Sequence, residues 1–190
     1  MNSELLRGRL EFLREAEKLK DVLRSAHTSS GRQESTAEHS WRLCLMALLF
    51  EDQLGDLDLL QVLKMCIVHD LGEAIHGDIP AVEQGAHPDK SQQEREDLQF
   101  LARTLDAPAR QRLLDLWDEY EGAVSTEART VKALDKLETL LQHTQGQNPA
   151  DFDYRFNLDY GRRYTSATPL FQALREQIDA DTQRRLDAAE

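Results

Sequence analysis

The chain has 190 residues, of which 40% are apolar, 23 are basic and 35 are acidic, giving a formal net charge of −12 at pH 7. This size and composition predict a single folded domain, and the acidic balance argues against a nucleic-acid-binding face, because phosphate backbones require clustered Lys and Arg. No apolar run approaches the roughly 18 residues needed to cross a bilayer. The charged residues 1–20 lack a signal-peptide core, so we expect a cytoplasmic protein without membrane contact.

The first third of the chain has helical periodicity with clear start and stop signals. Leucines spaced along residues 6–23 predict a first helix, and a polar loop follows at 27–33. Ser35 to Glu38 form a capping box, in which a hydroxyl and a Glu three residues later satisfy each other's backbone donors. The second helix that begins there should end near Gly55, and Asp56 should cap a third helix.

The rest of the chain predicts four more helices after an irregular stretch at 72–90, which is rich in glycine and proline. Their start signals are a second capping box at Ser91 to Glu94, the pair Asp106 and Pro108, Ser125 or Thr126, and Thr168 with Pro169. Helix dominates throughout. The sequence therefore predicts an all-α bundle of about six to eight helices.

One segment, residues 151–164, departs from helical periodicity. Its apolar residues Phe152, Tyr154, Phe156, Leu158 and Tyr160 alternate with polar ones, which is typical of an extended arm. A lone strand has no partner here, so a packed loop or a distorted helix is an equal alternative. We expect one domain, 1–190, with residues 146–190 packing on a core at about 19–145, and a role for 151–164 in an interface or a lid.

Two adjacent polar residues, His69 and Asp70, lie at the end of the predicted third helix. Asp70 follows Leu63 by seven residues and Cys66 by four, so its carboxylate falls on the apolar stripe of that helix. A bare carboxylate there would cost several kcal/mol, roughly, unless a cation or strong donors meet it. The position of Asp70 therefore indicates a partner, either a cation or strong hydrogen-bond donors.

Two further polar residues face the core from other helices. His39 precedes Leu43 by four residues and Met46 by seven, and Asp135 follows Val131 by four. Taken singly, a helical His or Asp is more often a satisfied core or boundary residue than a ligand. Together, two imidazoles and two carboxylates suit Mn²⁺, Co²⁺, Fe²⁺, Ni²⁺ or Zn²⁺, and Mg²⁺ less well. Such an ion activates a bound water and polarises a phosphate.

Four strings in the sequence, in order, resemble the signature of HD-domain phosphohydrolases. They read ESTAEHS at 34–40, VHDLGEA at 68–74, GDIP at 77–80 and KALDKLE at 132–138. Within that superfamily the chain is most similar to the 5′-deoxynucleotidases and the HD-domain-containing-2-type proteins. The resemblance implies an all-α bundle, one divalent metal ion, a nucleotide or other small phosphorylated substrate, and a homodimer.

The resemblance also implies roles for individual residues. The metal ligands are His39, His69, Asp70 and Asp135, and Asp70 borders the substrate. Glu73 acts near the scissile phosphate, where it delivers a proton or orients the attacking water. Substrate contacts fall on the loop Asp78, Ile79, Pro80 and Ala81, where Asp78 meets the sugar, and on Arg24, which meets the phosphate. From the pattern alone, Glu73 also fits an exposed residue at a helix end, and Arg24 also fits a solvent-facing residue at a helix terminus. Arg32 is a second candidate for contact with the phosphate.

One position departs from the deoxynucleotidase pattern. The residue after Arg24 is Ser25, where those enzymes have an aromatic residue that packs against the sugar. The sequence therefore does not decide whether the sugar of the substrate is deoxyribose or ribose, or whether the substrate is a nucleotide.

The sequence favours a phosphomonoesterase that releases phosphate from (deoxy)nucleoside 5′-monophosphates. The alternatives are a phosphodiesterase or guanosine-tetraphosphate hydrolase, a di-iron oxygenase, and a non-catalytic nucleotide-binding protein. A di-iron enzyme would need His76 or His87 to reach a second ion. We expect His76, His87 and His143 to be surface or loop residues.

Overall fold

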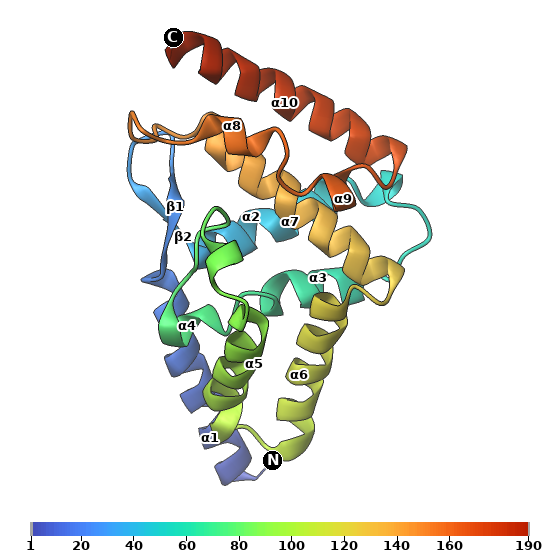
Figure 1. The fold of residues 1–190 in the computed structure, drawn as a ribbon. Coiled ribbons are helices and arrows are strands. Elements are labelled where there is room, and N and C mark those ends of the chain that lie inside the picture. Colours follow the sequence, from blue (N-terminus) through green and yellow to red (C-terminus); the bar gives the residue numbers. More distant parts are fainter. Residues whose placement is uncertain (1, 190) are drawn as a thin grey trace.

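The structure is a computed structural model that describes residues 2–189. Figure 1 shows a bundle in which α7, Thr126–Gln145, runs through the centre with other helices on several sides. The long elements are α1 (Ser3–Ala16), α2 (Thr36–Leu49), α3 (Leu59–Val68), α5 (Lys90–Leu101), α6 (Ala107–Gly122), α7 and α10 (Pro169–Ala189). The single-turn helices are α4 (Glu73–His76), α8 (Tyr154–Asn157) and α9 (Arg162–Thr165). The all-α prediction is confirmed.

The central helix α7 is buried on almost every side. Fourteen of its twenty residues are buried, and it contacts α2, α3, α6, α8, α9 and α10. A helix that is apolar around its whole circumference belongs in a core, but α7 also buries Asp135, Glu138 and His143. Those polar residues require partners, and they place the chemistry of the molecule on this helix.

The helices form two apolar clusters with the polar residues between them. One cluster joins α2, α3, α7 and α10 through residues such as Leu43, Met65, Leu134 and Phe171. The other joins the end of α3 to α5 and α6 through Leu98, Leu101 and Trp117. No helix within residues 2–189 is both long and apolar enough to span a bilayer.

A β-hairpin interrupts the predicted first helix. That helix ends at Ala16, and a 3-10 turn leads to β1 (Leu23–His27), which pairs antiparallel with β2 (Gln33–Ser35). Gly31, with φ +82°, turns the chain between the strands. The prediction of a helix to residue 23 was wrong, because the hairpin depends on tertiary contacts: Gln142 of α7 donates to the His27 carbonyl at 2.6 Å.

The predicted start signals have mixed outcomes. The capping box at Ser35 and Glu38 is present, and Asp106 and Ser125 cap α6 and α7. The caps expected at Asp56 and Ser91 were wrong, since Asp58 caps α3 and α5 begins at Lys90 without a side-chain cap. The second helix ends at Leu49, short of Gly55.

The alternating segment 151–164 is not an extended arm. It folds as the single turns α8 and α9 joined by irregular backbone, which agrees with the alternative of a distorted helix. In Figure 1 this segment lies between α7 and α10, and α10 crosses the top of the bundle.

Candidate metal centre

Helix α2 carries the first site residue, His39, into the core. The capping box at its start fixes the first turn, and His39 in that turn is fully buried. Its ring nitrogen Nδ1 pairs with a carboxylate oxygen of Glu138 on α7. A carboxylate only accepts at neutral pH, so Nδ1 carries a proton, and the lone pair of the neutral ring lies on Nε2. That Nε2 is buried without a hydrogen-bond partner among the described residues.

The second imidazole repeats this arrangement at the end of α3. His69 is 2% exposed, and its Nδ1 donates to the carbonyl of Cys66 at 2.9 Å. Its Nε2 is also buried and has no hydrogen-bond partner in the part of the chain that the structure describes. Trp117 holds the backbone here by donating its indole N–H to the His69 carbonyl at 3.1 Å.

Two carboxylates face the free imidazole nitrogens. Nε2 of His69 is 3.1 Å from Oδ2 of Asp70, and Nε2 of His39 is 3.3 Å from Oδ1 of Asp135 and 3.8 Å from Oδ2 of Asp70. Two unpartnered imidazole lone pairs beside two carboxylates form the donor set that a divalent transition metal prefers. The residues present therefore fit a metal ion, and the orphaned nitrogens are the observation that supports it.

Asp135 has further partners that keep it charged. It accepts from the Tyr120 hydroxyl at 2.9 Å and from Nζ of Lys136 at 2.8 Å. Burial acts to raise the pKa of Asp135, but chiefly the Lys136 ammonium outweighs it and holds that pKa well below its usual range. The carboxylate is thus ionised and oriented before any ligand arrives.

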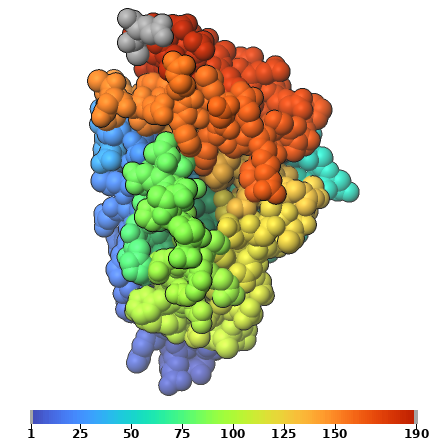
Figure 2. Space-filling model, in the orientation of Figure 1, coloured from blue at the N-terminus to red at the C-terminus, as the bar shows by residue number. Residues whose placement is uncertain are grey.

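Several of these residues, but not His39 or Glu138, line a cavity of about 580 Å³. Asp135, Lys136, Thr139 and His143 on α7 line it, together with β1, the loop after α4, the start of α5 and residues 151–160. Figure 2 shows the loop after α4 (green) and the C-terminal segment (orange) on the face where the molecule is hollowed. The cavity is large enough for a ligand of nucleotide size.

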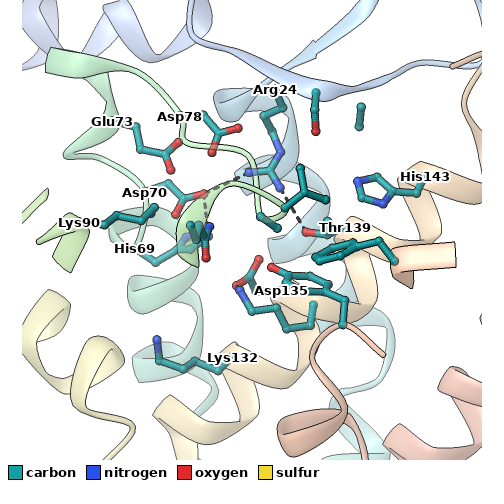
Figure 3. Close-up of a pocket in the computed structure, with 18 of the residues that line it drawn as sticks. Arg24, His69, Asp70, Glu73, Asp78, Lys90, Lys132, Asp135, Thr139 and His143 are labelled. Atoms are coloured by element: carbon teal, nitrogen blue, oxygen red, sulfur yellow. Dashed lines mark hydrogen bonds and ion pairs between the residues drawn. The ribbon is translucent and has the colours of Figure 1, made fainter. Parts of the chain in front are cut away.

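The hairpin places Arg24 beside the centre. Its NH1 lies 3.5 Å from Oδ2 of Asp70, and its NH2 donates to Oγ1 of Thr139 at 3.1 Å (Figure 3). Burial disfavours the charged form, but the carboxylates of Asp78, Asp70 and Glu73 raise the pKa of Arg24 above its usual value. Arg24 is therefore a buried cation that faces the cavity, in a strand rather than at a helix terminus.

Glu73 begins the short helix α4 and is 3% exposed. It accepts from the Thr36 hydroxyl at 3.1 Å. Burial and the nearby carboxylates of Asp70 and Asp78 raise the pKa of Glu73 well above its usual value. Gly72 allows this position, because a Cβ there would lie 2.5 Å from the Glu94 carbonyl of α5.

The structure brings most of the predicted site residues together. Besides the residues described above, Ser25, Asp78 and Ala81 line the cavity, whereas Ile79 and Pro80 are half-buried outside its lining. The phosphate candidate Arg32 pairs instead with Glu38 on the surface. His76, which pairs with Asp97, and His87 are both exposed and do not line the cavity.

The prediction for His143 was wrong. This residue is 6% exposed, lines the cavity and binds Oδ1 of Asn157 through Nδ1 at 2.8 Å. Its position could have been found, because His143 follows Asp135 by eight residues and therefore shares its helix face. Glu138 and Lys136 were also missed as site residues. Single charged residues on a helix are usually interpreted from sequence as solvated.

Comparison with known proteins identifies the class. Residues 16–175 match the model of the HD domain, and the chain therefore belongs to the HD-domain family. It is a metal-dependent phosphohydrolase of that family, related to the 5′-deoxynucleotidases named HDDC2.

The individual relatives cover most of the chain. The human 5′-deoxynucleotidase HDDC2 is 33% identical over 141 residues, which span 73% of this chain and 68% of the human protein. The Dictyostelium discoideum HDDC2 is 29% identical over 90% of this chain and 97% of its own length. The crystal structure of a predicted metal-dependent phosphohydrolase from Magnetospirillum magnetotacticum MS-1 is 28% identical, covers 96% of this chain and 94% of its own, and superposes with a TM-score of 0.84.

Proposed function

We propose that this chain is a 5′-nucleotidase that releases phosphate from (deoxy)nucleoside 5′-monophosphates with the help of one divalent metal ion. The observation that carries the proposal is the pair of buried, unpartnered Nε2 atoms of His39 and His69 beside two ionised carboxylates. The names of the relatives support the choice of a nucleoside monophosphate as substrate.

His39, His69, Asp70 and Asp135 would hold the ion, which we expect to be Mn²⁺, Co²⁺, Fe²⁺, Ni²⁺ or Zn²⁺ rather than Mg²⁺. When bound, such an ion supplies Lewis acidity toward the phosphate and lowers the pKa of a water molecule. The Nδ1 bonds of the two imidazoles to Glu138 and to the Cys66 carbonyl orient both rings for this purpose.

Arg24 is the cation best placed for the phosphate. Its guanidinium already spans from Asp70 to Thr139 across the cavity, and its planar fork matches two phosphate oxygens. Asp78, with Ile79, Pro80 and Ala81 on the same loop, would contact the sugar, and Ser25 next to Arg24 would border it. Asp70 would serve both metal and substrate.

Glu73 would supply the proton for the leaving group. Cleavage of the ester adds water to phosphorus and breaks the P–O5′ bond, which leaves negative charge on O5′. The raised pKa of Glu73 favours its protonated form, which can give a proton to O5′ as the bond breaks. The products are then inorganic phosphate and the nucleoside.

The alternatives fit this structure less well. A second iron has no ligand in His76 or His87, which lie outside the cavity lining. A guanosine-tetraphosphate hydrolase or phosphodiesterase would bind a substrate with more phosphate charge. The lysines that also line the cavity, Lys90 and Lys132, already pair with Glu94 and Glu121. A binding protein without catalysis would not require a buried carboxyl group, Glu73, beside the centre.

The experiment is phosphate release from a panel of ribo- and deoxyribonucleoside 5′-monophosphates by metal-stripped protein with Mn²⁺ or Co²⁺ added. Asp70→Asn should abolish release, and Asp115→Asn, an exposed change on α6, should not. The deoxy-to-ribo ratio measures the consequence of Ser25. Absence of release from every nucleotide would refute the proposal.

From the family resemblance we also propose a homodimer. Trp41, Leu45 and Leu48 on α2 are exposed and spaced along one helix face, which supplies an apolar surface. Light scattering after gel filtration tests it, and a monomer at micromolar concentration would refute it.

A further inference from the structure

One end of the cavity is aromatic. Phe152, Phe156 and Tyr160 line it from the C-terminal segment and His143 lines it from α7. They form two pairs: the rings of His143 and Phe152 meet edge to face with centroids 4.9 Å apart, and those of Phe156 and Tyr160 lie 5.0 Å apart at 31°. None of the four belongs to the proposed metal centre, and the proposed reaction leaves them without a role.

Helix α7 sets the spacing between this end and the metal centre. Asp135, Thr139 and His143 are four residues apart, so they share one face of the helix, and all three line the cavity. At about 1.5 Å per residue, His143 is about 12 Å along the axis from Asp135. Thr139, the partner of Arg24, lies midway. A phosphate, a pentose and a base in line have a comparable length.

Charged and neutral side chains of the cavity are also separated along the axis of α7. Arg24 pairs with Asp70 of the metal centre (Figure 3). Lys136 pairs with Asp135. At the other end, burial lowers the pKa of His143 to about 4, so its ring is neutral at physiological pH. Asp151 and Asp153 also border the cavity there and would repel a phosphate. A ligand with one anionic and one neutral, flat end would therefore enter in a single orientation.

The aromatic end is held in place by buried hydrogen bonds. Arg175 of α10, 3% exposed, donates to the carbonyls of Asn157, Leu158 and Tyr160 at 2.7, 2.8 and 2.7 Å. Asn148 donates to the Tyr154 hydroxyl at 3.0 Å and accepts from the His27 N–H at 3.0 Å. The aromatic side chains thus stand on fixed backbone, and a ligand would meet a preformed surface.

We propose that this aromatic end, with Phe152 and Phe156 as its principal contacts, binds the nucleobase of the substrate by stacking. The inference rests on the proposed nucleotidase function and adds to it the part of the protein that recognises the base. Every nucleobase has a π-face, so stacking favours nucleotides over other phosphate esters without selecting strongly among bases. The proposal also assigns a function to segment 151–160: by contacting the base, it would distinguish nucleotides from sugar phosphates as substrates.

The test compares Phe156→Leu and Phe152→Leu with the wild type on two substrates, deoxyadenosine 5′-monophosphate and 2-deoxyribose 5-phosphate, which lacks the base. Leucine keeps an apolar side chain but removes the π-face. We expect each variant to raise KM for the nucleotide about tenfold, with kcat almost unchanged, and to leave the sugar phosphate unaffected. The control is Phe100→Leu, the same change on the exposed face of α5.

The outcomes separate this inference from the proposed function. If the wild type cleaves both substrates with equal kcat/KM, or if the variants slow both alike, the base is not bound here and the inference fails while the nucleotidase stands. If the wild type cleaves no nucleotide, the proposed function fails. In that case, calorimetric titration of the metal-loaded protein with deoxyadenosine 5′-monophosphate tests the inference by itself. Weaker binding to Phe156→Leu than to the wild type supports the base-binding role of the aromatic end. Equal binding to both, or no binding to the wild type, overturns it.

Discussion

At the scale of single residues, Glu138 determines how well His39 can serve as a ligand. Its carboxylate is fully buried and bridges Nδ1 of His39 and Nε of Arg42. A carboxylate on the far nitrogen fixes the tautomer of a ligating imidazole and raises its basicity. Glu138 would therefore act on the proposed metal ion through His39.

Glu138→Gln should weaken metal binding by about 10- to 100-fold. The amide fills the same volume but can present its NH₂ to Nδ1, which would move the ring proton to Nε2 and block the lone pair. Calorimetric titration of the metal-free protein with Co²⁺ measures the affinity directly. Glu96→Gln, an exposed change on α5, is the matched control. Equal affinities for Glu138→Gln and the wild type would show that Glu138 only packs.

The sequence predicts ligands better than the residues that support them. His39, Asp70 and Asp135 stand out because polar groups on apolar helix faces need partners. Glu138 carries the same signal, since it follows Val131 by seven residues and Leu134 by four, but it was missed as a site residue. Its partner His39 is known only once α2 has packed on α7, which no local pattern contains.

At the scale of elements, the packing of α8 depends on one arginine of α10. Arg175 donates to three backbone carbonyls of the α8 region and to Oγ1 of Thr165. Arg175→Met keeps much of the side-chain volume but leaves these buried acceptors unpaired, at about 1–3 kcal/mol for a typical group. We expect a loss of about 3 kcal/mol or more in unfolding free energy.

Hydrogen exchange locates that effect. In Arg175→Met, amides of residues 151–166 should exchange faster, whereas those of α2 and α3 should follow only the global loss of stability. Arg184→Met, whose side chain is 72% exposed, should change neither. Uniform acceleration along the chain would mean that Arg175 stabilises the whole bundle and does not specifically anchor α8.

The elements that the sequence mispredicts are the ones fixed by distant contacts. Leu23 continues the leucine spacing of α1, but pairing with β2 and contact with α7 place residues 23–27 in a strand. The alternation from Phe152 to Tyr160 arises because α8 and α9 are short turns that bury side chains on two sides, against α7 and α10. A period of two therefore did not indicate a strand here.

At the scale of the whole molecule, the metal centre joins helices that are far apart in sequence. His39 comes from α2, His69 and Asp70 from the end of α3, and Asp135 from α7. An ion held by all of them links the principal helices of the larger apolar cluster, and any ligand that binds only the folded state stabilises it. Metal loading should therefore raise the midpoint of thermal unfolding.

The expected size follows from mass action. At a free ion concentration of 100 times Kd the gain is about 2.7 kcal/mol, which for a domain of this size corresponds to a shift of about 5–10 °C. Differential scanning calorimetry of the stripped protein, with and without Co²⁺, measures it, and excess chelator should reverse it. Asp70→Asn should largely remove the shift, whereas Asp97→Asn, next to the exposed His76, should retain it. If Asp70→Asn responds as the wild type does, the ion that stabilises the fold binds elsewhere, since the proposed centre cannot lose a carboxylate without losing affinity.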